Sequence, residues 1–190
     1  MTIESPHMLR ADARDNRDRA LQAARELFAE RGVGVSMREV ARRAGVGPAT
    51  LYRRFPSKQE LVDAAFAYEL VTCRSIVEEG CADPDPWHGF CTVIERITDL
   101  NAQNRGFVDA FLSAHPEIEA FAAHRASLLR MLRDLAARAR ASGGLRADFE
   151  LDDLVLVLVA GRGLSAVAAA RRRRAARRFA ALSIDAFRAR

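Results

Sequence analysis

Residues 36–55 read SMREVARRAGVGPATLYRRF, and this stretch decides the fold of the first third of the chain. It opens with the capping-box pattern of residues 36–39, in which a serine caps the third helical amide and a glutamate reaches back to the cap. The helix that follows ends at Gly45, a residue suited to the positive φ of a tight turn. A second short helix starts at Pro48, because proline is tolerated in a first turn, and ends before Pro56. Two short helices joined in this way predict a helix-turn-helix.

The apolar residues of this stretch fall on one face of the predicted motif. Ala41 is small where the two helices come closest, and the inner face holds Val40, Ala44, Val46 and Leu51. The outer face carries hydroxyls and arginines. In a helix-turn-helix the second helix enters the major groove of DNA, while the first crosses the phosphate backbone.

The rest of the chain is also predicted to be helical. Ala, Arg, Leu and Glu dominate, and no stretch shows sustained alternation of apolar and polar residues. We expect an all-α fold of about nine helices in two domains, with residues 1–60 forming the helix-turn-helix domain (1–13 disordered) and 61–190 the body. The expected helices span residues 14–31, 36–44, 48–54, 58–80, 86–104, 105–114, 115–142, 151–170 and, after an interruption at 171–174, a last helix to about 189.

The positive charge is concentrated at the start of the chain. Residues 1–58 hold eleven Arg and one Lys against seven acids, so they carry the whole formal net charge of +5, and residues 59–190 are neutral. A basic module on a neutral body indicates a polyanionic partner, although a solvated charged surface is an alternative.

Several classes of protein are excluded by what the sequence lacks. Three cysteines without CxxC spacing do not form a disulfide framework or a usual zinc site. No signal peptide or membrane-spanning run is visible, so we expect a cytoplasmic protein that does not enter a membrane. No catalytic triad, phosphate loop or paired carboxylates mark an enzyme or a cofactor site.

Four phrases in fixed order carry a resemblance to a known family. They are LFAERG at 27–32, ARRAGV at 41–46, TLYRRF at 50–55 and KQEL at 58–61. The segment from about residue 16 to 61 resembles the DNA-binding domain of TetR/AcrR-type transcriptional regulators. The resemblance implies a regulator that binds double-stranded DNA at a palindromic operator, as a homodimer and under the control of a small molecule. A repressor is expected; an activator or a ligand-free DNA-binding protein with a structural body is the alternative.

The resemblance also implies roles for individual residues in contact with DNA. Phosphates would be held by Ser36, Thr50, Tyr52 and Lys58, and the residues nearest the bases would be Arg38, Gly47, Pro48, Ala49 and Arg53 or Arg54. The tip at residues 47–49 departs from the polar residues often found there. Base recognition would therefore depend on arginines and on apolar contacts with thymine methyl groups.

For the body, the resemblance implies a dimer interface and a ligand pocket. The tail from 155 to 187 is similar to the SbtR-like subgroup, and the last two helices would pair with their copies through Leu154, Leu158, Gly161, Ser165, Phe179, Leu182 and Phe187. The alternative is that the helix at 151–170 is buried within a monomer. The ligand-wall candidates, of which Trp87 is the best, are Phe66, Trp87, Phe90, Ile94, Phe107, Phe111, Leu128 and Met131; residues of this kind more often belong to the core.

Three further features allow more than one interpretation. Cys73 and Cys91 are expected to be inert buried thiols, and cavity lining or redox sensing is the alternative. His115, Glu119 and His124 lack the spacing of a zinc motif, so no metal is expected. The arginines at 171–174, 177 and 178 predict an exposed turn remote from DNA, with a second DNA contact as the less favoured alternative.

Overall fold

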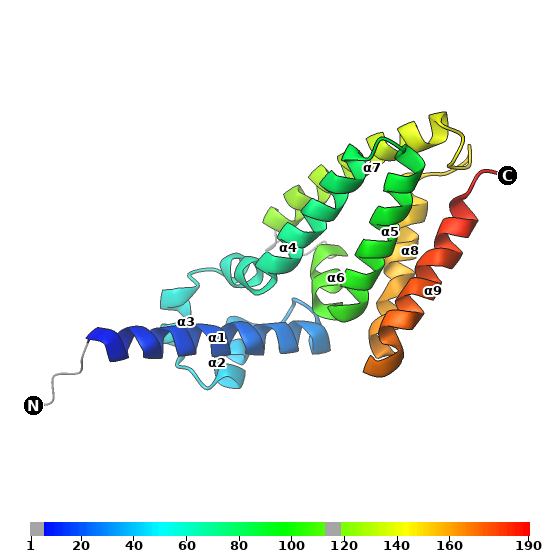
Figure 1. Cartoon of the computed structure of the whole chain (residues 1–190). Coiled ribbons are helices and arrows are strands. Elements are labelled where there is room, and N and C mark those ends of the chain that lie inside the picture. Colours follow the sequence, from blue (N-terminus) through cyan, green and yellow to red (C-terminus); the bar gives the residue numbers. More distant parts are fainter. Residues whose placement is uncertain (1–5, 113–118) are drawn as a thin grey trace, which may run out of the picture.

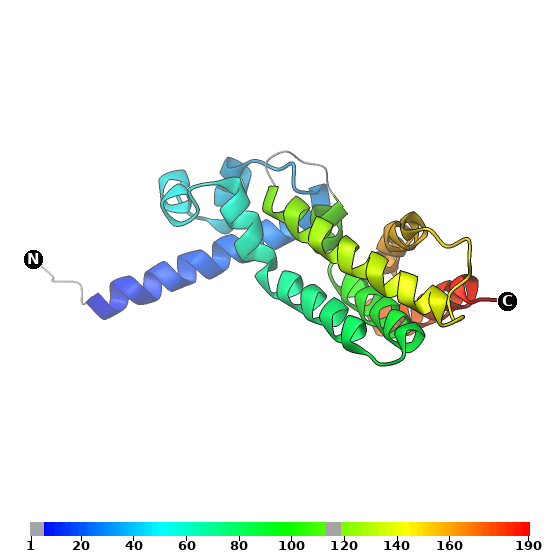
Figure 2. The same ribbon diagram turned by 90° about the horizontal axis from the view of Figure 1, so that it is seen from above.

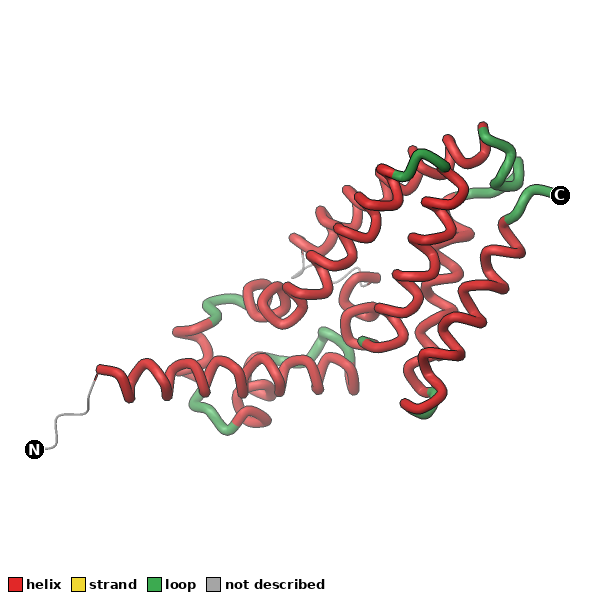
Figure 3. The backbone as a smooth tube through the Cα atoms, in the orientation of Figure 1, coloured by secondary structure: helices red, strands yellow, loops and turns green. Residues whose placement is uncertain are grey.

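The computed structural model describes residues 6–112 and 119–190, and within these ranges it is all-α (Figure 1). Nine α-helices and one short 3-10 helix follow each other without a strand in the described residues, as predicted (Figure 3). Their bounds are α1 Pro6–Arg31, α2 Met37–Ala44, α3 Pro48–Arg54, α4 Lys58–Ala82, α5 Pro86–Gln103, α6 Arg105–Leu112, α7 Glu119–Ala141, α8 Leu151–Ala160, η1 Gly161–Ala166 and α9 Ala169–Phe187.

The first helix is longer than predicted. α1 begins at Pro6, so residues 6–13 are helical and the prediction that they are disordered is wrong; residues 1–5 lie outside the described part. Proline is compatible with a helix start, and no glycine or proline interrupts the residues that follow it. The helix therefore extends well beyond the helix-turn-helix, as its blue end shows in Figure 1.

The end of the chain also differs from the prediction. We expected one helix over 151–170, but α8 ends at Ala160 and continues as the 3-10 segment η1. Gly161 and Gly163 weaken the α-helix at this point, because glycine is a poor helix former. The arginines at 171–174 do not interrupt a helix, since they lie in the first turns of α9.

α1, α2 and α3 form a small N-terminal unit around one apolar cluster. Its largest fully buried side chain is Phe28 of α1, which packs in the same core cluster as Val40 and Leu51. α4 then leads from this unit into the body, where α4 and α7 run side by side (Figures 1 and 2). α4 also crosses the predicted domain boundary at residue 60, so that boundary stays a prediction.

α5 lies at the centre of the body and contacts α4, α7, α9 and η1. Its crossing with α4 depends on two glycines, because a methyl group on Gly89 would collide with the carbonyl oxygen of Gly80. At the far end, the chain after α9 pairs with the loop before α8: the amide of Arg146 donates to the carbonyl of Phe187 at 2.9 Å. None of the helices that the structure describes is long and apolar enough to cross a membrane.

Candidate DNA interface and ligand cavity

The helix-turn-helix has the local geometry that its sequence predicts. The Ser36 hydroxyl accepts a hydrogen bond from the amide of Glu39, and the Glu39 carboxylate accepts one from the amide of Ser36 at 2.9 Å, which completes the capping box. Gly45 has φ 66° and ψ 32°, the left-handed conformation that the turn requires. The predicted inner face is confirmed: Val40, Ala41, Ala44 and Leu51 are buried, and Val46 is half-buried.

Ion pairs hold α2 against α1. The Arg43 guanidinium bonds both carboxylate oxygens of Glu30, at 3.1 and 2.8 Å, and this contact lowers the pKa of the Glu30 carboxyl. Hydrogen bonds from Ser36 and then from Arg31 lower the pKa of Glu39 to about 2. Both carboxylates are therefore charged at neutral pH, and they pair with arginines between α1 and α2. The Arg43 guanidinium is thus already paired within the N-terminal unit.

The predicted DNA-binding residues lie at the surface of the motif. Exposed or half-buried side chains and backbone are found at Ser36, Arg38, Gly47, Pro48, Ala49, Thr50, Tyr52, Arg53, Arg54 and Lys58. The Ser36 side chain already forms hydrogen bonds within the motif. Its hydroxyl caps α2 and also donates to the Glu39 carboxylate at 2.9 Å. Contact of these residues with DNA stays a prediction.

One basic residue beside the turn was missed by sequence reasoning. A guanidinium nitrogen of Arg19 on α1 lies 3.8 Å from the position that a side-chain carbon on Gly45 would occupy. Arg19 is exposed and is separated from the turn by more than twenty residues, so no local pattern could place it there. Its position adds a positive charge next to the motif.

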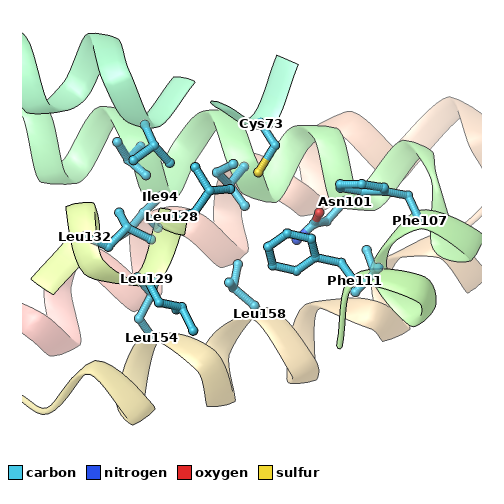
Figure 4. Close-up of a pocket in the computed structure, with 14 residues that line it drawn as sticks. Cys73, Ile94, Asn101, Phe107, Phe111, Leu128, Leu129, Leu132, Leu154 and Leu158 are labelled. Carbon is cyan, nitrogen blue, oxygen red and sulfur yellow. The ribbon is translucent and has the colours of Figure 1, made fainter. Parts of the chain in front are cut away.

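An apolar cavity of about 40 Å³ lies in the body between α4, α5, α6, α7 and α8 (Figure 4). Twelve of its fourteen lining residues are apolar, and none is charged. They are Cys73, Val77, Val93, Ile94, Ile97, Asn101, Phe107, Val108, Phe111, Leu128, Leu129, Leu132, Leu154 and Leu158. Ligand pockets typically measure about 300–1,000 Å³, so a ligand of that class would have to push these side chains apart.

Half of the residues predicted to form the ligand wall line this cavity, and ligand binding by them stays a prediction. Ile94, Phe107, Phe111 and Leu128 line the cavity. Phe66 and Phe90 are fully buried in the core, and neither Trp87 nor Met131 lines the cavity. Trp87 packs instead against Phe90 and Gly144: its ring stacks on Phe90 at 6.0 Å and fills the space that Gly144 leaves.

The three cysteines are free thiols with weak acidity. Burial raises the pKa of Cys73 to about 12 and that of Cys91 to about 11, and it also raises the pKa of Cys81. A thiol reacts as its thiolate, so these values favour inert side chains over redox sensors. Cys73 nevertheless lines the cavity, and Cys91 does not.

The stripe predicted for the dimer interface lies largely inside the protomer. Leu154, Gly161 and Phe187 are buried, with Gly161 beside Phe179, and the half-buried Leu158 lines the cavity, so these residues offer little surface to a second copy in this structure. Phe179 and Ser165 are half-buried, and the Ser165 hydroxyl donates to the carbonyl of Arg162 at 2.8 Å. Of the seven predicted residues, only Leu182 is exposed, at 50%.

The last two helices each carry exposed apolar side chains. Leu156 is 66% exposed and Val159 is 40% exposed on α8, and Leu182 adds to them from α9. Exposed leucine and valine side chains mark a contact surface for another protein where they form one contiguous patch.

Aromatic side chains connect the cavity to the N-terminal unit. Phe107 lines the cavity, and its ring lies 5.9 Å from that of Phe66 on α4, which lies 5.8 Å from that of Phe28 on α1. α4 is kinked at Phe66, where φ is −116° and ψ is 16°. α6 also touches α1 directly, since a side-chain carbon on Gly106 would lie 3.0 Å from the amide nitrogen of Ala29.

Metal ligation remains without support. His115 and the side chain of Glu119 fall outside what the structure describes, so the expected absence of a metal is untested at these positions. Among the described residues, no group of three or more His, Cys, Asp or Glu side chains is arranged to hold a metal ion.

Comparison with known proteins gives two family matches that together cover most of the chain. Residues 20–65 match the model for bacterial regulatory proteins of the tetR family, and residues 85–189 match the C-terminal domain of SbtR-like transcriptional regulators. An HTH-type transcriptional regulator of Staphylococcus aureus strain USA300 is 44% identical over 54 residues, which is 28% of this chain and 29% of that relative. The chain therefore matches less than a third of the length of this curated relative.

Solved structures match over nearly the whole chain. The TetR-family regulator SCO3833 of Streptomyces coelicolor has a TM-score of 0.72 and 22% identity, covering 89% of this chain and 90% of that one. The regulator SCO0520 of the same species has a TM-score of 0.52 and 28% identity, with 91% and 98% covered. Each of these relatives is described as a transcriptional regulator and not as an enzyme. The similarity to SCO3833 shows that the two chains share a fold.

Proposed function

Because the chain belongs to the TetR family of bacterial regulatory proteins, we propose that it is a homodimeric repressor that a small molecule releases from a palindromic operator. The observation that carries the DNA-binding part is the left-handed Gly45, which joins α2 to an exposed α3. In this proposal α3 would enter the major groove with Arg53, Arg54 and the tip at residues 47–49 toward the bases. The site of action would be DNA in the cytoplasm.

Dimerisation is supported by the apolar face of α8 and α9. Leu156, Val159 and Leu182 would be covered by the same residues of a second copy, since the interface of a two-fold dimer is self-complementary. Two recognition helices related by this axis would meet half-sites about 34–36 Å apart, which is one turn of DNA. This arrangement explains why the operator would be palindromic.

The ligand response is supported by the elements that the cavity shares with the N-terminal unit. Phe107 and Val108 of α6 line the cavity, and Gly106 of the same helix contacts α1. A ligand that enlarges the cavity displaces α6, and the close contact at Gly106 passes this movement to α1. The ring of Phe66 transmits a second displacement to the kink of α4. Release of DNA requires that the ligand bind the displaced state more tightly than the resting one.

The first experiment measures DNA affinity by fluorescence anisotropy. The duplex upstream of the protein's own gene is compared with a scrambled duplex at about 150 mM salt, where specific regulators bind roughly 10³-fold more tightly than to random DNA. The double variant Arg53→Ala/Arg54→Ala should lose at least about tenfold in specific affinity. Arg133→Ala, an exposed arginine of α7, is the matched control. Equal affinity for both duplexes, or equal loss in the control, would contradict specific recognition by α3.

The second experiment tests the coupling between body and DNA. Gly106→Ala places a methyl group 3.0 Å from the amide nitrogen of Ala29, so α6 must shift away from α1. We expect weaker DNA binding although residue 106 does not touch DNA. Gly163→Ala, where the added methyl group meets no atom within 4 Å, should leave the affinity unchanged. If Gly106→Ala binds DNA as the native protein does, α6 does not carry the signal.

A further inference from the structure

The cavity contains one polar side chain that the fold does not use. Asn101 of α5 is only 7% exposed, and its carboxamide makes no hydrogen bond to any residue that the structure describes. Figure 4 shows this carboxamide near the Cys73 thiol and the ring of Phe111. A carboxamide that lines a cavity and forms no hydrogen bond within the described residues is available to a molecule that enters the cavity.

The surroundings of Asn101 restrict the chemistry of that partner. None of the fourteen lining residues is charged, and burial keeps the Cys73 thiol neutral by raising its pKa to about 12. An ionised carboxylate, phosphate or ammonium group would enter without a counter-charge, which is strongly unfavourable in apolar surroundings. An apolar molecule with one uncharged hydrogen-bonding group would satisfy the carboxamide, which offers two donors and one acceptor oxygen.

We propose that this cavity takes an uncharged, mostly apolar ligand and that Asn101 selects it by a hydrogen bond to a single hydroxyl or carbonyl group. This inference rests on the proposed function, since it concerns the ligand that would release DNA. It adds a specificity-determining residue and a ligand class to that proposal. Phe107 and Phe111 of α6 are at the same end of the cavity, so a ligand bonded to Asn101 presses on the helix that contacts α1.

The size of the cavity limits the first probes to small molecules. A volume of about 40 Å³ is far below that of a typical ligand pocket, so the rim must open. Phe111 and Leu158 are half-buried lining residues and can move outward at lower cost than the fully buried ones. Three probes that share the ethylbenzene frame vary the polar group: 4-ethylphenol adds a hydroxyl, ethylbenzene adds nothing, and 4-ethylbenzoate adds a charged carboxylate.

The test measures the dissociation constant of each probe by calorimetry, with the full-length protein. In the native protein 4-ethylphenol should bind about tenfold more tightly than ethylbenzene, and 4-ethylbenzoate should bind worst. Asn101→Leu should abolish the preference for the phenol. Thr98→Val is the matched control, because Thr98 is a buried α5 residue that does not line the cavity, and its hydroxyl has no partner in the described structure.

Folding of the variants is checked by thermal melting. Asn101→Leu should melt at or above the native temperature, since it removes an unbonded buried amide. The inference would be overturned if Asn101→Leu kept its preference for the phenol or if Thr98→Val lost it. It would also be overturned if 4-ethylbenzoate bound most tightly or if no probe bound. Selective binding without release of DNA in the anisotropy assay would leave it standing and would contradict the proposed repressor mechanism instead.

Discussion

The side chain of Arg25 on α1 donates a hydrogen bond from Nε to the backbone carbonyl of Ala65 on α4, at 2.7 Å. Ala65 immediately precedes Phe66, the residue at which α4 departs from helical geometry. A side chain that bonds a helix carbonyl is a recognised cause of a kink. The bond therefore ties the first helix of the N-terminal unit to the bend in the helix that leads into the body.

Replacing Arg25 should destabilise the fold, because it removes this hydrogen bond between α1 and α4. Because a hydrogen bond from a charged donor contributes roughly 1.5–3 kcal/mol, Arg25→Gln should lower the free energy of unfolding by about 1–2 kcal/mol in urea titrations. Gln22→Ala is the control, since Gln22 is exposed on the same helix and bonds only Glu26. A loss in the control as large as that in Arg25→Gln would show that the bond to Ala65 is not the cause.

Replacing Gly45 by any residue with a side chain should destabilise the protein. Its φ of 66° is costly for L-residues, by about 1–2 kcal/mol, so Gly45→Ala should lower the free energy of unfolding by that amount and weaken DNA binding through a distorted turn. Gly34→Ala provides the comparison, because Gly34 does not have a positive φ and an added methyl group meets nothing within 4 Å. Chemical denaturation of both variants measures the difference. If Gly45→Ala and Gly34→Ala are equally stable, the positive φ at residue 45 does not disfavour a side chain.

The helix-turn-helix was predictable because its determinants are local. The capping box at Ser36 and Glu39, the glycine of the turn and the buried Val40 all lie within ten residues of one another. Such patterns specify backbone geometry without reference to the rest of the chain. The same locality explains why Arg19 was missed, since only the packing of α1 against α2 brings it to the turn.

The body was less predictable because its helices are apolar on more than one side. Residues 154–160 read LVLVLVA, so their periodicity does not reveal which stripe faces inward. The stripe of Leu154 and Leu158 was assigned to the dimer interface, and the structure turns it toward the cavity. The α-helix ends after Ala160, where Gly161 and Gly163 follow. The sequence places Gly161 in the predicted dimer interface and does not predict a helix end at this glycine.

The exposed face of α8 and α9 should govern assembly. Leu156→Glu and Leu182→Glu each place a charge in the proposed interface, so we expect monomers at concentrations where the native protein is dimeric, with at least about tenfold weaker operator binding after loss of the second half-site. Val71→Glu changes a side chain that is 70% exposed on α4 and should remain dimeric. Sedimentation equilibrium measures the mass. A dimer in both α8 and α9 variants would place the interface elsewhere.

His124 should make stability depend on pH. Its pKa is lowered from 6.5, first by burial and then by the charge of Arg74, and its buried Nε2 atom has no partner among the described residues. The unfolded chain then binds this proton more readily than the folded one, so the stability due to His124 is lost as pH falls from 6.5 toward the lowered pKa. Urea titrations between about pH 5 and 8 should show this decline in the native protein and a weaker one in His124→Phe.

His88 provides an internal contrast for that measurement. Its hydrogen bond to Asp83, at 2.7 Å, raises the pKa of the imidazole, so its contribution is present below 6.5 and is lost as pH rises through the raised value. Both side chains of this pair are at the protein surface, where solvent screens the interaction, so His88→Gln should change the profile little and in the opposite sense. A His124→Phe profile identical to the native one would show that residue 124 does not titrate differently in the folded and unfolded states.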